Sequence, residues 1–231
     1  MRAVIPAAGR GTRMLNVTNG SAKELLQLGE STVIEWVLGE AFNVCDQAVV
    51  VWDINKGDLP SGVAWVPQMP LRGLAPAIAS GVTTEATNLI LLPDAIFLPH
   101  DPAGKMAVMG EGDVVLALSQ VTEEEVSKYG ICEVDEHGFV TRMLEKPSPS
   151  DTTSRWAITG RYRLSGKAAE LLIETTTANI AFDTEMDMSH FFSAALENGL
   201  RIAGCFLDES FHRFDCGDPE GYRLASEAFA K

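Results

Sequence analysis

Cysteine is scarce in this 231-residue chain, and its four copies stand far apart, at Cys45, Cys132, Cys205 and Cys216. No two of them form a CxxC pair, so the sequence has neither a zinc knuckle nor a redox motif of that kind. Scattered cysteines without a disulfide framework are typical of a reducing compartment. No apolar run is long enough to span a bilayer, and the first run is too short for a signal peptide. We therefore predict a cytoplasmic protein without a membrane partner.

Basic residues are also few, since 18 lysines and arginines stand against 32 aspartates and glutamates and the formal net charge is −14. Such a surface repels the phosphates of nucleic acids and of anionic lipids, so neither is an expected partner. A small anionic substrate remains compatible with this charge, because a local cluster of arginine and lysine outweighs the global sign at short range. Apolar residues make up 46% of the chain, which is enough for a substantial core.

Short apolar runs alternate with helical patterns along the first half of the chain. Expected strands cover residues 3–7, 48–52, 62–66, 88–92 and 114–118, and expected helices begin near residues 33 and 76. This alternation predicts an α/β fold with a mostly parallel sheet that is buried on both faces. The second half is less regular. It is expected to contain a hairpin of strands 130–134 and 139–144, strands 156–164, 202–207 and 212–214, and helices 168–174, 189–198 and 219–230.

A glycine-rich turn, Ala7-Ala8-Gly9-Arg10-Gly11-Thr12-Arg13, follows the first expected strand. Its small residues let the backbone approach a polyphosphate, whose oxygens then face successive amide groups. Arg13 adds a planar, permanently charged fork suited to phosphate. By itself the turn is also compatible with a plain strand-to-helix connection or with a dinucleotide-binding turn. The dinucleotide turn fits poorly, because Met14 stands where a third small residue is needed and Asp53 comes too late to bind a ribose.

Two aspartates far apart in the sequence are candidate metal ligands. Asp94 follows the expected strand 88–92, and open α/β sheets bind ligands at the carboxyl ends of their strands. Asp215 lies close to Gly217, which lets the chain bend and expose the carboxylate. Two such carboxylates can share one Mg²⁺ that bridges phosphate oxygens. Asp94 alone is equally compatible with a turn or a helix N-cap, and Asp218, which precedes a proline, is expected to cap the last helix.

The glycine-rich turn is followed by the run Lys23-Glu24-Leu25-Leu26. Turn and run together resemble the opening of the sugar-1-phosphate nucleotidyltransferases, the nucleotide-sugar pyrophosphorylases, and are nearest to the family's bacterial uridylyltransferase form. The resemblance implies a Rossmann-like three-layer fold with a mixed, mostly parallel central sheet. It also implies that Arg13 and Lys23 grip a triphosphate, whereas Lys23 alone would be interpreted as a solvated surface lysine.

The same resemblance assigns roles along the whole chain, within one domain whose nucleotide-binding half is 1–120 and whose sugar-phosphate-binding half is 121–231. The implied catalytic residues are Arg13, Lys23 and Lys146, and the implied Mg²⁺ ligands are Asp94 and Asp215. The implied nucleotide-binding residues are Ala7, Ala8, Gly9, Gly11, Thr12, Gln68 and Gly73. The implied sugar-binding residues are Tyr129, Gly130, Glu145 and Gly160. A glutamine amide suits the edge of a uracil or thymine ring, although a water-exposed loop position is the other interpretation of Gln68.

Several features depart from the family pattern. Ala22 replaces the proline that usually precedes the lysine, and the stretch from Thr184 ends with His190 in place of an aspartate. The segment 53–63 is short and is expected to be a bare loop where relatives carry a helix. There is no hexapeptide repeat, so no attached acyltransferase domain is expected. Because the change at His190 falls near the sugar, the sequence leaves the identity of the sugar open.

The sequence predicts an enzyme that forms an NDP-sugar and pyrophosphate from an NTP and a sugar 1-phosphate by in-line displacement. UTP and glucose 1-phosphate are the expected substrates, and the expected catalysis is positioning and charge neutralisation. The alternatives are a thymidylyl- or cytidylyltransferase that acts on another phosphorylated small molecule, and a non-catalytic nucleotide-sugar-binding protein. A NAD-dependent dehydrogenase fits less well than any of these. A homo-oligomer is compatible with the sequence.

Overall fold

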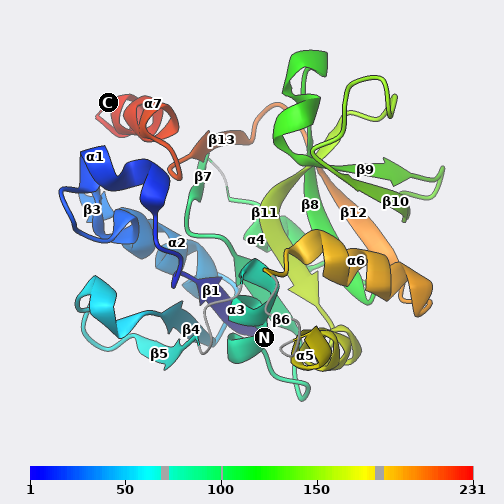
Figure 1. Cartoon of the computed structure of the whole chain (residues 1–231), viewed down its shortest axis with the longest axis horizontal. Coiled ribbons are helices and arrows are strands. Elements are labelled where there is room, and N and C mark those ends of the chain that lie inside the picture. The colour runs from blue at the N-terminus through cyan, green and yellow to red at the C-terminus, as the bar shows by residue number, and fades with distance from the viewer. Residues whose placement is uncertain (69–72, 100, 180–184, 231) are drawn as a thin grey trace.

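The computed structural model describes residues 1–68, 73–99, 101–179 and 185–230. Within these residues nine strands form one mixed sheet between two layers of helices (Figure 1). Its strands are β1 (Arg2–Pro6), β4 (Gln47–Trp52), β5 (Ala64–Pro67), β6 (Asn88–Leu91), β8 (Val114–Gln120), β9 (Gly130–Val134), β10 (Val140–Glu145), β11 (Trp156–Leu164) and β12 (Ile202–Leu207). Two small ribbons lie outside the sheet: β2 (Gln27–Leu28) with β3 (Ser31–Thr32), and β7 (Ala95–Leu98) with β13 (His212–Asp215).

Helices and short turns connect these strands. The helices are α1 (Leu15–Thr18), α2 (Val33–Phe42), α3 (Leu74–Gly81), α4 (Ala103–Ala107), α5 (Gly166–Asn179), α6 (Met188–Glu197) and α7 (Pro219–Phe229). The 3-10 turns are η1 (Thr12–Met14), η2 (Lys23–Leu25), η3 (Ile54–Lys56) and η4 (Glu123–Lys128). Among the described residues, no helix combines the length and the apolar character that a membrane crossing needs.

The central sheet is parallel at its core and mixed beyond it. Strands β5, β4, β1 and β6 run parallel in that order, and β11 pairs antiparallel with β6, β8 and β9. The expected α/β class is therefore confirmed, with a mixed central sheet that is mostly parallel at its core. Because β1, β4 and β6 are parallel, their carboxyl ends meet at one edge of the sheet, where such folds bind ligands.

Alternating side chains divide the core into two faces. Ala3 and Ile5 of β1 pack in one cluster with α2, whereas Val4 faces Ala77 of α3 on the other side. Ile90 of β6 packs in a cluster that includes residues of α3, α5 and α6. This double burial is the reason that the strands read as continuous apolar runs in the sequence.

Two departures from the expected elements bear on the site. Strand β7 was not expected, and it pairs antiparallel with β13, with Asp215 opposite Ala95. The segment 53–63, expected as a bare loop, contains η3, and the Asp53 carboxylate accepts a hydrogen bond from the Asn55 amide at 3.0 Å. A short polar side chain that caps a single turn is a weak sequence signal.

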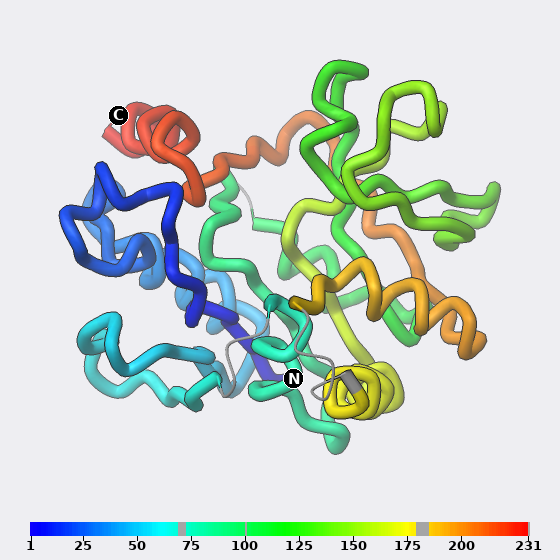
Figure 2. Tube along the Cα trace, in the orientation of Figure 1, coloured from blue at the N-terminus to red at the C-terminus, as the bar shows by residue number. Residues whose placement is uncertain are grey.

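The last helix returns to the start of the chain, as Figure 2 shows by the red C-terminal segment beside the blue N-terminal one. Tyr222 of α7 donates a hydrogen bond to the Gln27 carbonyl at 2.6 Å. As expected, Asp218 caps this helix, because its carboxylate accepts the Gly221 amide hydrogen at 2.9 Å. Because α7 contacts both β13 and β2, it links the end of β13 to the N-terminal part of the chain.

Candidate active site

The glycine-rich turn leaves β1 at the carboxyl edge of the sheet. The Ala7 amide donates to the Val51 carbonyl at 2.9 Å and continues the strand pairing, so Ala7 does not line the cavity next to the turn. Gly11 has φ 60°, a left-handed conformation that glycine adopts without strain. Ala8, Gly9, Gly11 and Thr12 line a cavity of about 620 Å³. The turn therefore borders a half-open cavity, into which a phosphate group could approach its backbone.

A buried lysine that the sequence reasoning missed holds this turn from behind. Lys56 Nζ donates to the carbonyls of Ala7 and Gly9 at 2.6 and 2.9 Å and to Glu24 Oε2 at 2.7 Å. Burial lowers the pKa of Lys56, and the nearby Glu24 carboxylate offsets part of this effect. All three donors of the ammonium are therefore used, and two of them fix carbonyls of the turn. The sequence feature that could have pointed to Lys56 is its place shortly after β4, a strand that pairs with β1.

Removal of this clamp is expected to weaken nucleotide binding more than sugar binding. We expect the double substitution Lys56→Met with Glu24→Gln, which leaves no lone buried charge, to raise KM for the NTP on the order of tenfold, because the loop amides lose their fixed direction. Steady-state kinetics with each substrate varied in turn measures the effect. Lys167→Met, at an exposed helix position, is the control. An equal rise in both KM values would contradict the expectation.

The two candidate metal ligands come together although they are far apart in the sequence. Asp94 follows β6, Asp215 ends β13, and the Cys216 amide donates to the Asp94 carbonyl at 2.7 Å. A methyl group on Gly217 would lie 2.9 Å from Asp215 Oδ1 and 3.0 Å from Asp94 Oδ2. The same point is 3.4 Å from Arg13 Nη2. Three residues that the resemblance singled out thus surround one glycine, which leaves space between them.

Lys23 is held against Asp94 rather than in solvent. Its Nζ donates to Asp94 Oδ2 at 2.8 Å, and its side chain is only 12% exposed. Burial alone would lower the pKa of Lys23, but the charge of Asp94 and the hydrogen bond to it raise that pKa above its usual value. Burial alone would raise the pKa of Asp94, and Lys23 brings it below its usual value. The interpretation of Lys23 as a surface lysine is therefore wrong.

The donor set suits a hard cation that keeps other ligands. Among the residues that the structure describes, no group of three or more histidine, cysteine, aspartate or glutamate side chains could hold a metal. Asp94 and Asp215 supply two carboxylates, which is the number by which Mg²⁺ is usually held when substrate phosphates and water complete its shell. This pair fits such an ion better than it fits zinc, which prefers nitrogen and sulfur ligands.

The far wall of the same cavity carries the candidate base-binding residues. Gln68 Nε2 donates to the Gly73 carbonyl at 3.0 Å, and Gln68 is 6% exposed, so a water-exposed glutamine is ruled out. Gly73 has φ 105°, and a side chain there would lie 2.6 Å from the Met186 carbonyl. Only glycine fits this close approach. The remaining carboxamide oxygen of Gln68 is not used in any hydrogen bond within the described residues.

A second cavity, of about 230 Å³, opens beside the first and shares Asp94 with it. It brings together all the residues that the resemblance assigned to the sugar and its phosphate, namely Tyr129, Gly130, Glu145, Lys146 and Gly160. Lys146 has φ 45°, which is rare outside glycine, and its backbone amide donates a hydrogen bond to the Tyr129 carbonyl at 3.1 Å, which holds this conformation. Burial raises the pKa of the Glu145 carboxyl, and the charge of Lys146 offsets only part of this effect.

The unusual segment near the sugar residues is only partly described. Thr184 lies outside the described residues. Asp187 and Ser189 line the second cavity, and His190 is exposed but near enough to Glu145 for its charge to work against the rise in the pKa of that carboxyl. The residue that replaces the family's aspartate is therefore beside this cavity.

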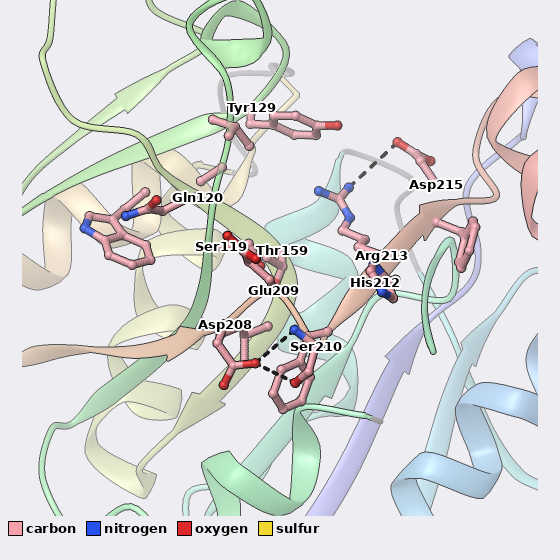
Figure 3. Close-up of a pocket in the computed structure, with 16 residues that line it drawn as sticks. Ser119, Gln120, Tyr129, Thr159, Asp208, Glu209, Ser210, His212, Arg213 and Asp215 are labelled. Atoms are coloured by element: carbon pink, nitrogen blue, oxygen red, sulfur yellow. Dashed lines mark hydrogen bonds and ion pairs between the residues drawn. The ribbon is translucent and has the colours of Figure 1, made fainter. Parts of the chain in front are cut away.

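Two arginines near the site, Arg161 and Arg213, were assigned no role from the sequence. Arg161 is fully buried and donates to both oxygens of Glu40 at 2.9 and 2.6 Å. It also donates to the carbonyls of Leu92 and Ala95 at 2.9 and 2.6 Å, so it fixes the chain on both sides of Asp94. Arg213 lies near Asp215, at the border of the second cavity and a third one, which Figure 3 shows.

A parallel sheet with a glycine-rich turn at its carboxyl edge, and with cations and paired carboxylates around that turn, is typical of a nucleotide-binding α/β protein. Comparison with known families makes this class specific. The sequence model of the family described as Nucleotidyl transferase matches residues 2–231, and the chain belongs to this family. Members of it generally use a divalent metal.

Individual relatives agree with this assignment. The chain is 27% identical to a UTP–glucose-1-phosphate uridylyltransferase from Haemophilus ducreyi over 97% of its own length and 91% of that protein. It is 28% identical to UTP–glucose-1-phosphate uridylyltransferase 1 of Staphylococcus saprophyticus over 99% and 92% of the two chains. Among solved structures, a UDP-glucose pyrophosphorylase complexed with UDP-glucose superposes with a TM-score of 0.82 at 26% identity and covers 99% and 98% of the chains.

Proposed function

We propose that the protein transfers a uridylyl group from UTP to glucose 1-phosphate and releases pyrophosphate. The observation that carries this proposal is the pair of adjoining cavities, one lined by the glycine-rich loop and one lined by Lys146, which share Asp94. Two anionic substrates placed in these cavities would meet with their phosphates at that carboxylate. The relatives at 26–28% identity are two UTP–glucose-1-phosphate uridylyltransferases and a UDP-glucose pyrophosphorylase, and they supply the identity of the nucleotide and the sugar.

The reaction is an in-line displacement at the α-phosphorus. An oxygen of the sugar phosphate attacks that phosphorus, one new P–O bond forms, and the bond to the pyrophosphate group breaks with the electron pair leaving on pyrophosphate. Arg13 and Lys23 bind the triphosphate and neutralise the charge on the leaving group, and Lys146 binds the sugar phosphate. No covalent enzyme intermediate is required.

Recognition of the two substrates rests on different groups. The free carboxamide oxygen of Gln68 accepts the N3 hydrogen of uracil, and the backbone at Gly73 contacts the same base edge. On the other side, Gly130, Glu145 and Gly160 face the sugar hydroxyls together with Tyr129. Mg²⁺ bound by Asp94 and Asp215 would supply positive charge to the phosphates. A cytoplasmic enzyme with these two substrates needs no nucleic acid or membrane partner.

A pyrophosphate-release screen tests this function directly. UTP, dTTP, CTP, ATP and GTP are each combined with a panel of sugar 1-phosphates, with magnesium present. The expected result is turnover with UTP and glucose 1-phosphate, and the lowest turnover with the purine nucleotides. Release with CTP or dTTP and another sugar phosphate would replace the substrate assignment. Nucleotide binding without any release would instead identify a nucleotide-sugar-binding protein.

A further inference from the structure

Arg213 is a cation without the partners that a buried arginine normally has. It lies in β13, where it pairs with Phe97 of β7, and its side chain is only 21% exposed. Its guanidinium donates no hydrogen bond within the residues that the structure describes, and its Nε is completely buried without an acceptor. The nearest carboxylate oxygen, Asp215 Oδ2, is 3.8 Å away, and Figure 3 shows the guanidinium directed toward it.

The contrast with Arg161 shows what this means. The guanidinium carbon of Arg161 also lies next to an aromatic ring, 5.1 Å from the centre of Phe97, but each of its donor nitrogens makes at least one hydrogen bond. Arg161 is therefore satisfied within the protein and holds the fold. A buried donor left unpaired costs free energy, and at a site for anions such a donor is available for a ligand. Arg213 has such an unpaired donor among the described residues, and Arg161 does not.

The cavity that Arg213 lines indicates which anion it binds. Arg213 lines the cavity that contains Lys146 and Gly130, and it does not line the cavity of the glycine-rich loop. Its guanidinium lies 4.9 Å from the centre of the Tyr129 ring, and this ring fixes the plane of the fork. Lys146, by comparison, has a side chain that is 63% exposed and provides a single point charge.

We propose that Arg213 binds the phosphate of the sugar 1-phosphate and orients its attacking oxygen, with Tyr129 and Asp215 holding the guanidinium in position. A planar fork that donates two hydrogen bonds fixes the direction of a phosphate, which a lysine alone does not. Arg213 and Asp94 line the same cavity, and Asp94 also lines the cavity of the glycine-rich loop, so Arg213 lies close to the place where the two cavities meet. This inference rests on the proposed function.

The test compares Arg213→Met and Arg213→Lys with the wild-type protein. For Arg213→Met we expect KM for glucose 1-phosphate to rise at least tenfold and kcat to fall, with less than about a twofold change in KM for UTP. Arg213→Lys retains the charge without the fork and is expected to recover only part of the loss. Arg201→Met is the matched control, because Arg201 also stacks on an aromatic ring, Phe139, and pairs with a carboxylate, Glu111, outside the site.

A binding measurement separates this inference from the proposed function. Calorimetric titration of glucose 1-phosphate into metal-free protein is expected to show at least tenfold weaker binding by Arg213→Met than by wild type, with native folding verified by circular dichroism. Unchanged sugar-phosphate binding and KM in a folded Arg213→Met variant would overturn the inference. A wild-type protein that binds glucose 1-phosphate but releases no pyrophosphate would overturn the proposed function alone. No binding by wild type would overturn both.

Discussion

Replacement of Asp215 by alanine is expected to lower kcat on the order of 10²-fold or more, the usual cost of removing one preorganised charge contact from a reaction centre. The reason is its place opposite Asp94 across Gly217, where both carboxylates face the same small space. The substitution removes one of the two candidate carboxylate ligands of the divalent ion. Pyrophosphate release at saturating substrates, repeated over a range of magnesium concentrations, measures the change.

Asp218→Ala provides the matched control for this experiment. It removes an aspartate three residues away, whose role is to cap α7, and should cost about 1 kcal/mol of stability with little change in kcat. If Asp215→Ala retained wild-type turnover, or if Asp218→Ala lost as much, the assignment of Asp215 as the metal ligand would fail.

The buried pair of Glu40 and Arg161 is expected to show the largest effect on stability. Arg161→Met leaves the Glu40 carboxylate, which has a side chain only 7% exposed, without its partner, and breaking such a pair costs about 3–5 kcal/mol. Urea unfolding monitored by circular dichroism measures the loss as a lower midpoint at an unchanged slope. Because Arg161 also holds the carbonyls of Leu92 and Ala95, the remaining folded protein should lose activity as Asp94 becomes less fixed.

Two further variants make this prediction specific. The double substitution Arg161→Met with Glu40→Leu removes both charges and should recover a large part of the stability, because the cost arises from the lone buried charge. Glu220→Gln breaks an exposed pair with Arg223 and should leave the urea midpoint almost unchanged. Equal destabilisation by the double and single variants would contradict the explanation.

The sequence by itself determined the strands of the parallel core and the place of the glycine-rich turn. These features are local, because burial on both faces produces continuous apolar runs and a close phosphate approach requires small residues in consecutive positions. The family motifs also indicated Lys23, Asp94 and Asp215 as candidates, and the structure brings these three into one neighbourhood. What each of them contributes to turnover stays a prediction until the variants are measured.

Tertiary structure alone decided how these parts meet and what the unassigned cations do. The pairing of β7 with β13 joins segments more than 100 residues apart, and a long-range pairing leaves no local pattern. Lys56, Arg161 and Arg213 could not be distinguished in the sequence from other basic residues. Their roles depend on whether each donor finds an acceptor. Among the described residues, Lys56 and Arg161 do and Arg213 does not, and only the assembled fold determines which acceptors surround a side chain.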